Sequence, residues 1–261
     1  MDIIKFSDFL LEHKLWYKTI SQFLIWLEEK SKNMDFVFVD TETTGLGGPK
    51  KTQLTQLSAI SSEYFIDVNE FKEKNSFNEK IKLTYETKQK KSIDDNINRV
   101  LSFNRYGSGD FKYKNEKDVI IMFYEWLKQE KNPLLIMQNA SFDMNMLNAR
   151  TDIRFNNEIL DTKQVIQLYF IPLIQKLSET DNEYKKMIEK IGTSTRDSGL
   201  ISSSMSKIGP ALGLNMSGYH DALVDCKITM EMLRRIIEIL KKYPNVDIMK
   251  YQIERIKIIK K

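Results

Sequence analysis

The sequence predicts an α/β fold in which helices flank a mixed β-sheet, with a helical extension at each end of the chain. Three observations support this fold. Residues 36–39 form a continuous apolar run of β-forming residues, typical of a strand buried on both faces. Further strand-like segments follow in the first third. From residue 118 onward, strand and helix patterns alternate.

The first third is expected to contain helix and then strands. Apolar residues recur at helical spacing from Trp16 to Leu27, so residues 3–32 are predicted to form one or two amphipathic helices. A helix that docks a partner is the alternative. After the strand at 36–39, strands are expected at 54–60, 64–68 and 79–83. The polar segment 84–118 is expected to hold a helix at 94–101 and a loop at 106–114.

The remainder alternates between the two kinds of element. Helices are expected at 118–128, 140–150, 161–177 and 222–241, strands at 134–137 and 159–160, and a loop rich in Ser, Thr and Gly at 192–204. The predicted domains are an N-terminal helical extension (1–33), a central domain (34–242) and a basic C-terminal helical tail (243–261).

Composition limits the class of protein. The 261 residues fit one large domain or a core with appendages, and 41% hydrophobic with 29% charged residues is typical of a globular protein. The single cysteine, Cys226, excludes an internal disulfide and a zinc site built from cysteines, so we expect an intracellular, cytoplasmic location. Asp2 and Asp8 interrupt any signal peptide, and no apolar run reaches about 18 residues, so no membrane association is expected.

The net charge of +4 comes from the tail. Residues 241–261 hold seven Lys or Arg and two acidic residues, and the rest of the chain holds 33 basic and 34 acidic residues. Overall charge therefore gives no argument for nucleic-acid binding. Ile248, Tyr251, Ile256 and Ile259 recur near helical spacing, which predicts a packed amphipathic helix with its Lys and Arg side chains facing outward.

The first motif is Asp40-Thr41-Glu42-Thr43-Thr44-Gly45, at the end of the apolar strand. Side chains alternate along a strand, so Asp40 and Glu42 project from the same face. Two such carboxylates resist ionising unless cations intervene, and Mg²⁺ is a suitable partner. A strand-ending turn in which the acids cap loop amides is the alternative.

The second motif is Gln138-Asn139-Ala140-Ser141-Phe142-Asp143, where a strand ends and a helix begins. Asn139 is expected to cap the helix and contact a ligand, with Asp143 on the same face four residues later. The alternative for Asp143 is simple complementation of the helix dipole.

The third motif is His220-Asp221-Ala222-Leu223-Val224-Asp225. Residues five apart on a helix differ by about 140° in direction, so His220 and Asp225 would not converge if both were helical. Asp221 is a good N-cap after a loop-like segment, so His220 is expected on the loop and Asp225 in the first turns. The other histidine, His13, lies near no acidic group of this kind.

Together the three motifs resemble the DEDDh family of 3′→5′ exonucleases, over roughly residues 35–240. The family pattern D-x-E, N-x-x-x-D and H-x-x-x-x-D is met in order, Thr43-Thr44-Gly45 follows the first motif, and Asp161-Thr162 matches a later pair. The departure is Gln138, where many relatives carry histidine. It leaves the metal set intact but weakens inferences about nucleotide contacts.

The resemblance implies an RNase H-like fold and a two-metal phosphodiester hydrolase. Two Mg²⁺ ions, with Mn²⁺ expected to substitute, would be held by four carboxylates. These ligands are Asp40, Glu42, Asp143 and Asp225. His220 would be the general base.

The resemblance also implies a substrate and its contacts. The substrate would be a nucleic acid with a single-stranded 3′ end, most simply DNA, and a polymerase or replication partner is possible. Thr43, Leu46, Asn139 and Phe142 would contact the terminal nucleotide. Core packing is the alternative for Phe142, and Cys226 is expected to be a buried helix residue.

Two other functions stay open. One is an exoribonuclease or oligoribonuclease with the same chemistry, because recognition of the 2′-OH cannot be located in the sequence. The other is a catalytically silent nucleic-acid-binding or polymerase-accessory module. All five catalytic positions are present, which such a module would not require.

Overall fold

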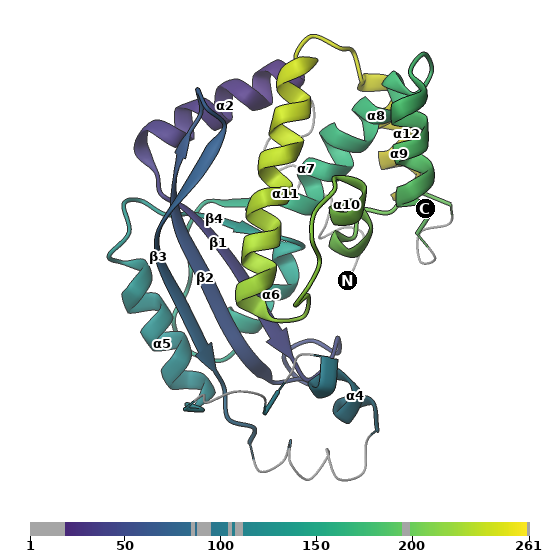
Figure 1. The fold of residues 1–261 in the computed structure, drawn as a ribbon. Helices are drawn as coiled ribbons and strands as arrows, with labels where there is room; N and C mark the ends of the chain where they lie inside the picture. The colour runs from purple at the N-terminus through teal and green to yellow at the C-terminus, as the bar shows by residue number, and fades with distance from the viewer. Residues whose placement is uncertain are drawn as a thin grey trace. The chain divides into compact units, whose positions relative to one another are not determined.

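A computed structural model of the chain describes residues 19–84, 87, 95–103, 106–107, 112–194 and 199–259 (Figure 1). His13, Trp16 and residues 108–111 of the segment predicted as a loop at 106–114 lie outside this part of the chain. The described residues divide into two compact units. One contains Asn33–Asp161 and Met216–Met230; the other contains the described part of Met1–Lys32, together with Thr162–Asn215 and Glu231–Lys261. We describe each unit separately.

In the described part of the first unit, five strands form one mixed sheet in the order β3-β2-β1-β4-β5. The antiparallel strands are β1 (Phe36–Thr43), β2 (Leu54–Phe65) and β3 (Glu70–Lys80). Strands β4 (Leu134–Met137) and β5 (Ile159–Asp161) run parallel to β1. The mixed sheet is therefore confirmed, and the carboxyl ends of β1, β4 and β5 lie at the same edge.

Two predicted boundaries in this sheet are wrong. Strands expected at 54–60 and 64–68 are one continuous strand, β2, and the strand expected at 79–83 is the end of a longer strand, β3. The serines between the two predicted strands are paired inside the sheet. Ser62 donates to the carbonyl of Phe36 (3.0 Å), and Ser61 donates to the buried carboxylate of Glu130. Strand β3 lies at the edge of the sheet, and its polar residues 72–76 are all exposed.

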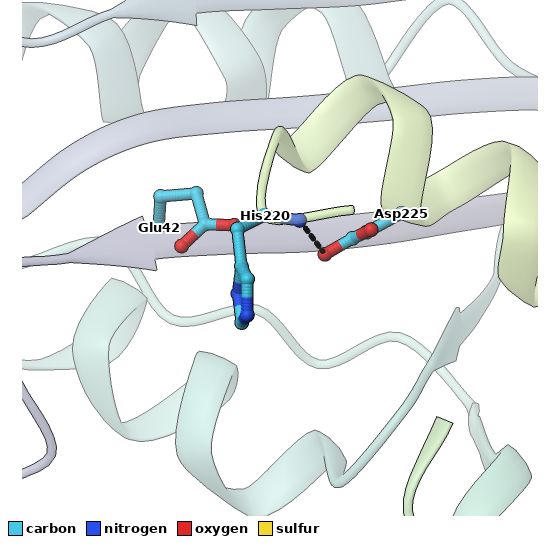
Figure 2. Close-up of side chains that lie close together, drawn as sticks. All are labelled: Glu42, His220 and Asp225. Atoms are coloured by element: carbon cyan, nitrogen blue, oxygen red, sulfur yellow. Dashed lines mark hydrogen bonds between the residues drawn. The ribbon is translucent and has the colours of Figure 1, made fainter. Parts of the chain in front are cut away.

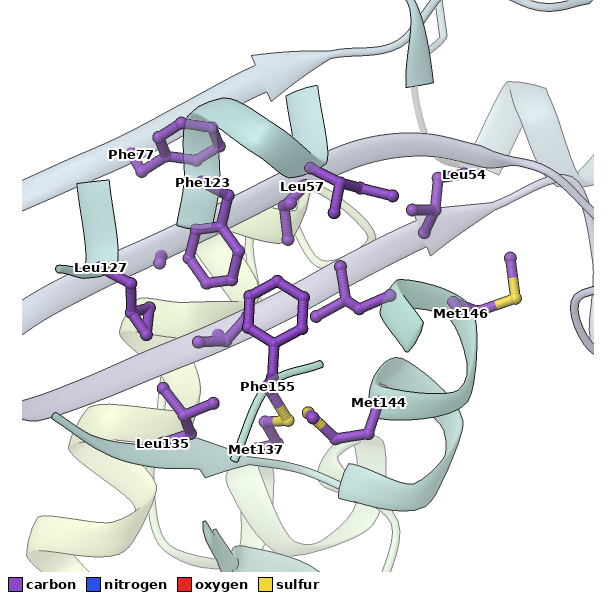
Figure 3. Close-up of a cluster of buried hydrophobic side chains, with 14 of the residues drawn as sticks. Leu54, Leu57, Phe77, Phe123, Leu127, Leu135, Met137, Met144, Met146 and Phe155 are labelled. Atoms are coloured by element: carbon purple, nitrogen blue, oxygen red, sulfur yellow. The ribbon is translucent and has the colours of Figure 1, made fainter. Parts of the chain in front are cut away.

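Helices α5 (Glu116–Leu127) and α6 (Ala140–Asn148) pack against the sheet, close to the predicted ranges. Figure 3 shows the apolar cluster between them and the strands, in which Phe123 and Phe155 meet at 5.7 Å between ring centroids. Val37 and Val39 of β1 belong to the same cluster. Burial of each large apolar side chain contributes about 1.5–3 kcal/mol. This packing fixes β1 and α6, the elements that carry the first two motifs.

Helix α4 (Asp95–Phe103) also confirms a predicted helix. Helix α11 (Ala222–Lys242) matches the predicted 222–241, and its first turns, to Met230, belong to the unit that contains the sheet. Cys226 is 1% exposed, as expected for a buried helix residue. The third motif is thereby in the same unit as the first two.

The second unit is helical in its described part. Helix α2 (Ile20–Asn33) belongs to this unit up to Lys32, and the ring of Phe23 stacks on Tyr169 at 4.7 Å between centroids. The helix predicted over 161–177 is continuous but contains a π-helical segment. Its parts are α7 (Thr162–Val165), η1 (Ile166–Phe170) and α8 (Ile171–Leu177).

Helices α9 (Asn182–Ile191) and α10 (Met205–Ala211) were not predicted. The tail forms α12 (Met249–Ile259), with Ile248 buried beside it, which confirms packing of the tail. The expectation that its basic side chains all face outward is wrong. Arg255 is 4% exposed, and its Nη2 donates to the carbonyl of Ile201 (2.9 Å). None of the described helices is long and apolar enough to cross a bilayer.

Candidate active site

The first motif occupies the carboxyl end of β1. Asp40 pairs with Ser58 and Glu42 with Gln56 across the neighbouring strand β2, so both carboxylates project from the same face of the sheet. Glu42 is 8% exposed and Asp40 is partly buried. The geometry expected from strand alternation is therefore present.

Asp143 approaches β1 from helix α6 and is 3% exposed. Its Oδ1 accepts two hydrogen bonds from Thr41, one from the hydroxyl (2.6 Å) and one from the backbone amide (3.1 Å). One carboxylate oxygen is thus fixed by the residue between Asp40 and Glu42. This role of Thr41 could not be predicted from its position in the first motif.

The cap of helix α6 differs from the prediction. Asn139 precedes the helix with φ of 74°, in the left-handed region, and its side chain makes no capping bond. The carboxylate of Asp161 caps the helix instead, accepting from the amides of Asn139 (3.0 Å) and Ala140 (3.2 Å). Because Asn139 is not helical, it does not share a helix face with Asp143. Asp161 therefore orients the helix that carries Asp143.

The third motif has the predicted loop-and-helix arrangement. Asp221 Oδ1 accepts from the amides of Leu223 (3.1 Å) and Val224 (3.4 Å), so Asp221 caps α11. His220 lies before the helix with φ of 72°, a conformation that costs free energy for a residue with a side chain. Its amide donates to Asp225 Oδ2 (3.3 Å). Backbone strain at His220 thus lets the imidazole and the Asp225 carboxylate lie together.

Three side chains converge closely (Figure 2). One ligand atom from each of Glu42, His220 and Asp225 lies within 4.8 Å of the other two. In Figure 2 His220 lies between the two carboxylates. Residues 42 and 220–225, far apart in sequence, therefore meet at the end of β1.

Burial raises the pKa values of all four carboxyl groups, and neighbouring acids raise those of Asp40 and Glu42 further. Burial, then Asp225 and Asp143, raise the pKa of Glu42 to about 8, and burial raises the pKa values of Asp143 and Asp225 to about 7. For Asp40, burial and the charges of Asp143, Glu42 and Asp225 raise the pKa well above its ordinary value. Burial lowers the pKa of His220. Four acids that resist ionising together form a functional-site candidate.

The cluster fits a divalent cation. Oδ1 of Asp225 is buried and has no hydrogen-bond partner among the residues that the structure describes, which is costly unless a ligand satisfies it. Carboxylate oxygens are the ligands that Mg²⁺ prefers, and a bound cation would favour the ionised acids. Glu42 and Asp225 are close enough to share an ion, and Asp40 and Asp143 are coupled to them through their charges.

The predicted nucleotide contacts differ in exposure. Leu46 is 75% exposed beside the site-bearing strand, whereas Thr43 is buried and its hydroxyl donates to the carbonyl of Gly45 (2.7 Å). Phe142 is partly buried against the apolar cluster, as in the core-packing alternative. Asn139 is also partly buried. The nucleotide contacts of these four residues stay predictions.

A stability prediction follows from the raised pKa values. A carboxylate whose pKa is higher in the folded state stabilises the fold below its unfolded pKa, and the contribution is lost as pH rises through the folded value. For Asp143 this window runs from about 4 to about 7. Without metal, wild type should therefore become less stable than Asp143→Asn as pH rises from 5 to 8, by on the order of a few kcal/mol.

Melting temperatures of both proteins in chelator, measured across this range, test the prediction. Adding Mg²⁺ or Mn²⁺ at pH 8 should raise the melting temperature of wild type more than that of the variant. A constant difference between the two proteins at all pH values would contradict the prediction.

The chain matches the family model RNase_T, described as an exonuclease, over residues 37–233. No curated protein matches the chain. Several solved structures do. One is a zinc-bound complex of E. coli exonuclease I with single-stranded DNA, at 16% identity and a TM-score of 0.53, covering 81% of this chain and 42% of that one.

Two further structures of the E. coli enzyme give similar values. The complex with a dA16 oligonucleotide has 16% identity and a TM-score of 0.52, covering 85% of this chain and 45% of that one. The complex with a dT13 oligonucleotide has 17% identity and a TM-score of 0.51, covering 77% and 40%. The chain thus spans less than half the length of these proteins. At such identities the likeness shows the fold, and the predicted RNase H-like fold is confirmed.

Proposed function

The chain belongs to the RNase T family of exonucleases, and from that membership we propose that it removes nucleotides one at a time from the 3′ end of single-stranded DNA, using two divalent metal ions. The observation that carries the proposal is the cluster of buried acids beside His220. Glu42, His220 and Asp225 offer ligand atoms within 4.8 Å of one another. Burial raises the pKa values of both acids, and repulsion from Asp225 and Asp143 raises that of Glu42 further. Such an arrangement is costly for a binding module and useful for a metal-dependent hydrolase.

Each residue has a proposed role. Asp40, Glu42, Asp143 and Asp225 would hold the metal ions, and Thr41 keeps one oxygen of Asp143 in a fixed position. When bound there, such ions would supply Lewis-acid stabilisation of the charge that develops on the attacking and leaving oxygens and would lower the pKa of the attacking water.

His220 removes the proton. Its pKa is lowered by burial, so the imidazole is neutral near pH 7 and a ring nitrogen can accept a proton from the attacking water. The water oxygen bonds to phosphorus, the bond to the 3′ oxygen breaks, and a nucleoside monophosphate leaves.

The substrate is proposed from the structures that share the fold. Three of them are described as complexes with single-stranded DNA, dA16 or dT13. In this chain Leu46 is the most exposed large apolar side chain among the described residues, so it is available to pack against a terminal base. Thr43, Asn139 and Phe142 complete the proposed contacts. A polymerase or replication partner stays a prediction.

Digestion of end-labelled oligonucleotides tests the function. With Mg²⁺ or Mn²⁺, a 5′-labelled DNA strand should shorten from its 3′ end one nucleotide at a time, and a strand of the same sequence in RNA should be digested more slowly. Excess EDTA should stop digestion. Faster digestion of the RNA strand would favour the exoribonuclease alternative, and no metal-dependent digestion of either strand would leave the silent binding module.

A further inference from the structure

A buried lysine lies in the same row of the sheet as Glu42. Glu42 pairs with Gln56 on β2, and Gln56 pairs with Lys80 on β3, so the three side chains form one row across the sheet on one face. The side chain of Lys80 is 2% exposed. A buried lysine is costly unless polar groups surround it, so its partners indicate what holds it there.

Those partners connect the sheet to the third motif. The Lys80 ammonium donates to Gln56 Oε1 (3.0 Å) and lies 3.5 Å from Asp221 Oδ2. Gln56 Nε2 donates to Asp221 Oδ1 (3.3 Å), and Gln56 Oε1 accepts from the amide of Ala222 (3.3 Å). Gln56 and Lys80 therefore contact the two residues that directly follow His220 in the sequence.

Neighbouring side chains fix the network. Gln56 Nε2 also donates to Asn78 Oδ1 (2.9 Å), which accepts in addition from the hydroxyl of Ser58 (2.8 Å). Gln56 is thus held in one orientation, with its carbonyl oxygen toward Lys80 and Ala222. Satisfied buried networks of this kind rigidify the segment they contact.

His220 has a strained backbone conformation, which neighbouring contacts must stabilise. A residue at φ of 72° persists only where its surroundings impose it, and the amide of His220 donates to Asp225 Oδ2 at 3.3 Å. The side chain of Asp221 both caps α11 and reaches the sheet. The turn that carries the imidazole is therefore set by contacts to β2 and β3.

We propose that Lys80, Gln56 and Asp221 are positioning residues, which hold the His220 turn against the sheet so that the imidazole faces the water to be deprotonated. The inference rests on the proposed function for the role of His220. It assigns no contact with substrate to the three residues. Their effect is exerted through the turn.

Steady-state kinetics of Lys80→Met test the proposal. Loss of the ammonium frees the turn, so kcat should fall by about 10–100-fold, the usual effect of removing an outer partner of a metal site, with little change in KM. In a His220→Ala background the same substitution should cost much less, because no imidazole remains to be positioned. Equal losses in both backgrounds would overturn the proposal in favour of a general structural role.

The matched control is Lys74→Met on the same strand. Lys74 pairs with Asp35 (2.7 Å) and Glu130 (3.7 Å), and it lies six residues from Lys80, on the order of 20 Å along the strand. The Lys74→Met substitution should leave kcat at the wild-type value. Asp221→Asn serves if Lys80→Met does not fold, because asparagine keeps the cap of α11 and removes only the ion pair.

A second measurement needs no activity. The chain has two histidines, so the imidazole NMR signals of metal-free, ¹⁵N-histidine-labelled protein can be assigned by the signal missing from His220→Ala. Lys80→Met should shift or broaden the His220 signal, and Lys74→Met should not. An unchanged His220 signal in Lys80→Met would overturn the inference, whereas an inactive wild type would overturn the proposed function alone.

Discussion

Replacing Asp143 by asparagine is expected to abolish digestion while leaving the fold intact. Asparagine can still accept the hydrogen bonds from Thr41, so the side chain should keep its orientation. The lost negative charge, however, weakens the hold on the metal ions. Their contribution is several kcal/mol of transition-state stabilisation, so the rate should fall roughly 10³-fold or more.

Single-turnover digestion of a labelled strand at saturating Mg²⁺ measures this loss. Asp118→Asn, an exposed acid in the first turn of α5, is the control for loss of one negative charge and should digest at the wild-type rate. Digestion by Asp143→Asn at a rate within tenfold of wild type would argue against Asp143 as a metal ligand.

Replacing His220 by alanine is expected to lower the rate by about 10²–10⁴-fold, the usual contribution of a positioned general base. The wild-type rate should fall as pH drops through the pKa of His220, because the protonated imidazole cannot accept a proton. Burial lowers this pKa from its ordinary value of 6.5, so the loss should occur on the acid side of neutrality.

The pH dependence of kcat/KM for the two proteins provides the measurement, with His13→Ala as a control that removes the other histidine. The variant should lack the limb that reports His220, and the control should keep it. If His220→Ala retains the wild-type profile, another group accepts the proton.

Much of the site could be predicted because each motif combines a local pattern with a local structure. An apolar run identified β1, and strand alternation then put Asp40 and Glu42 on one face. Asp221 is a good N-cap residue, which correctly predicted that His220 lies before helix α11 and not within it. These inferences required only neighbours within a few residues in the sequence.

What could not be predicted depends on partners far apart in the chain. The bond from Thr41 to Asp143 spans 102 residues, and the bond from Ala222 to Gln56 spans 166. Asn139 is of a residue type that often caps helices, but the carboxylate of Asp161, from strand β5, makes the capping bonds instead. The two serines inside β2, Ser61 and Ser62, bond to Glu130 and Phe36, which are also distant in the sequence.

The unit that holds the site is discontinuous in sequence, with Thr162–Asn215 lying between its two parts. On the ribosome the chain therefore completes all five strands before it has a proton acceptor. At about 5–20 residues per second, synthesis from Asp161 to His220 takes roughly 3–12 s. During that interval the nascent chain carries three of the four acids but lacks both Asp225 and the histidine. A chain truncated before Met216 would keep the sheet residues and lose the chemistry.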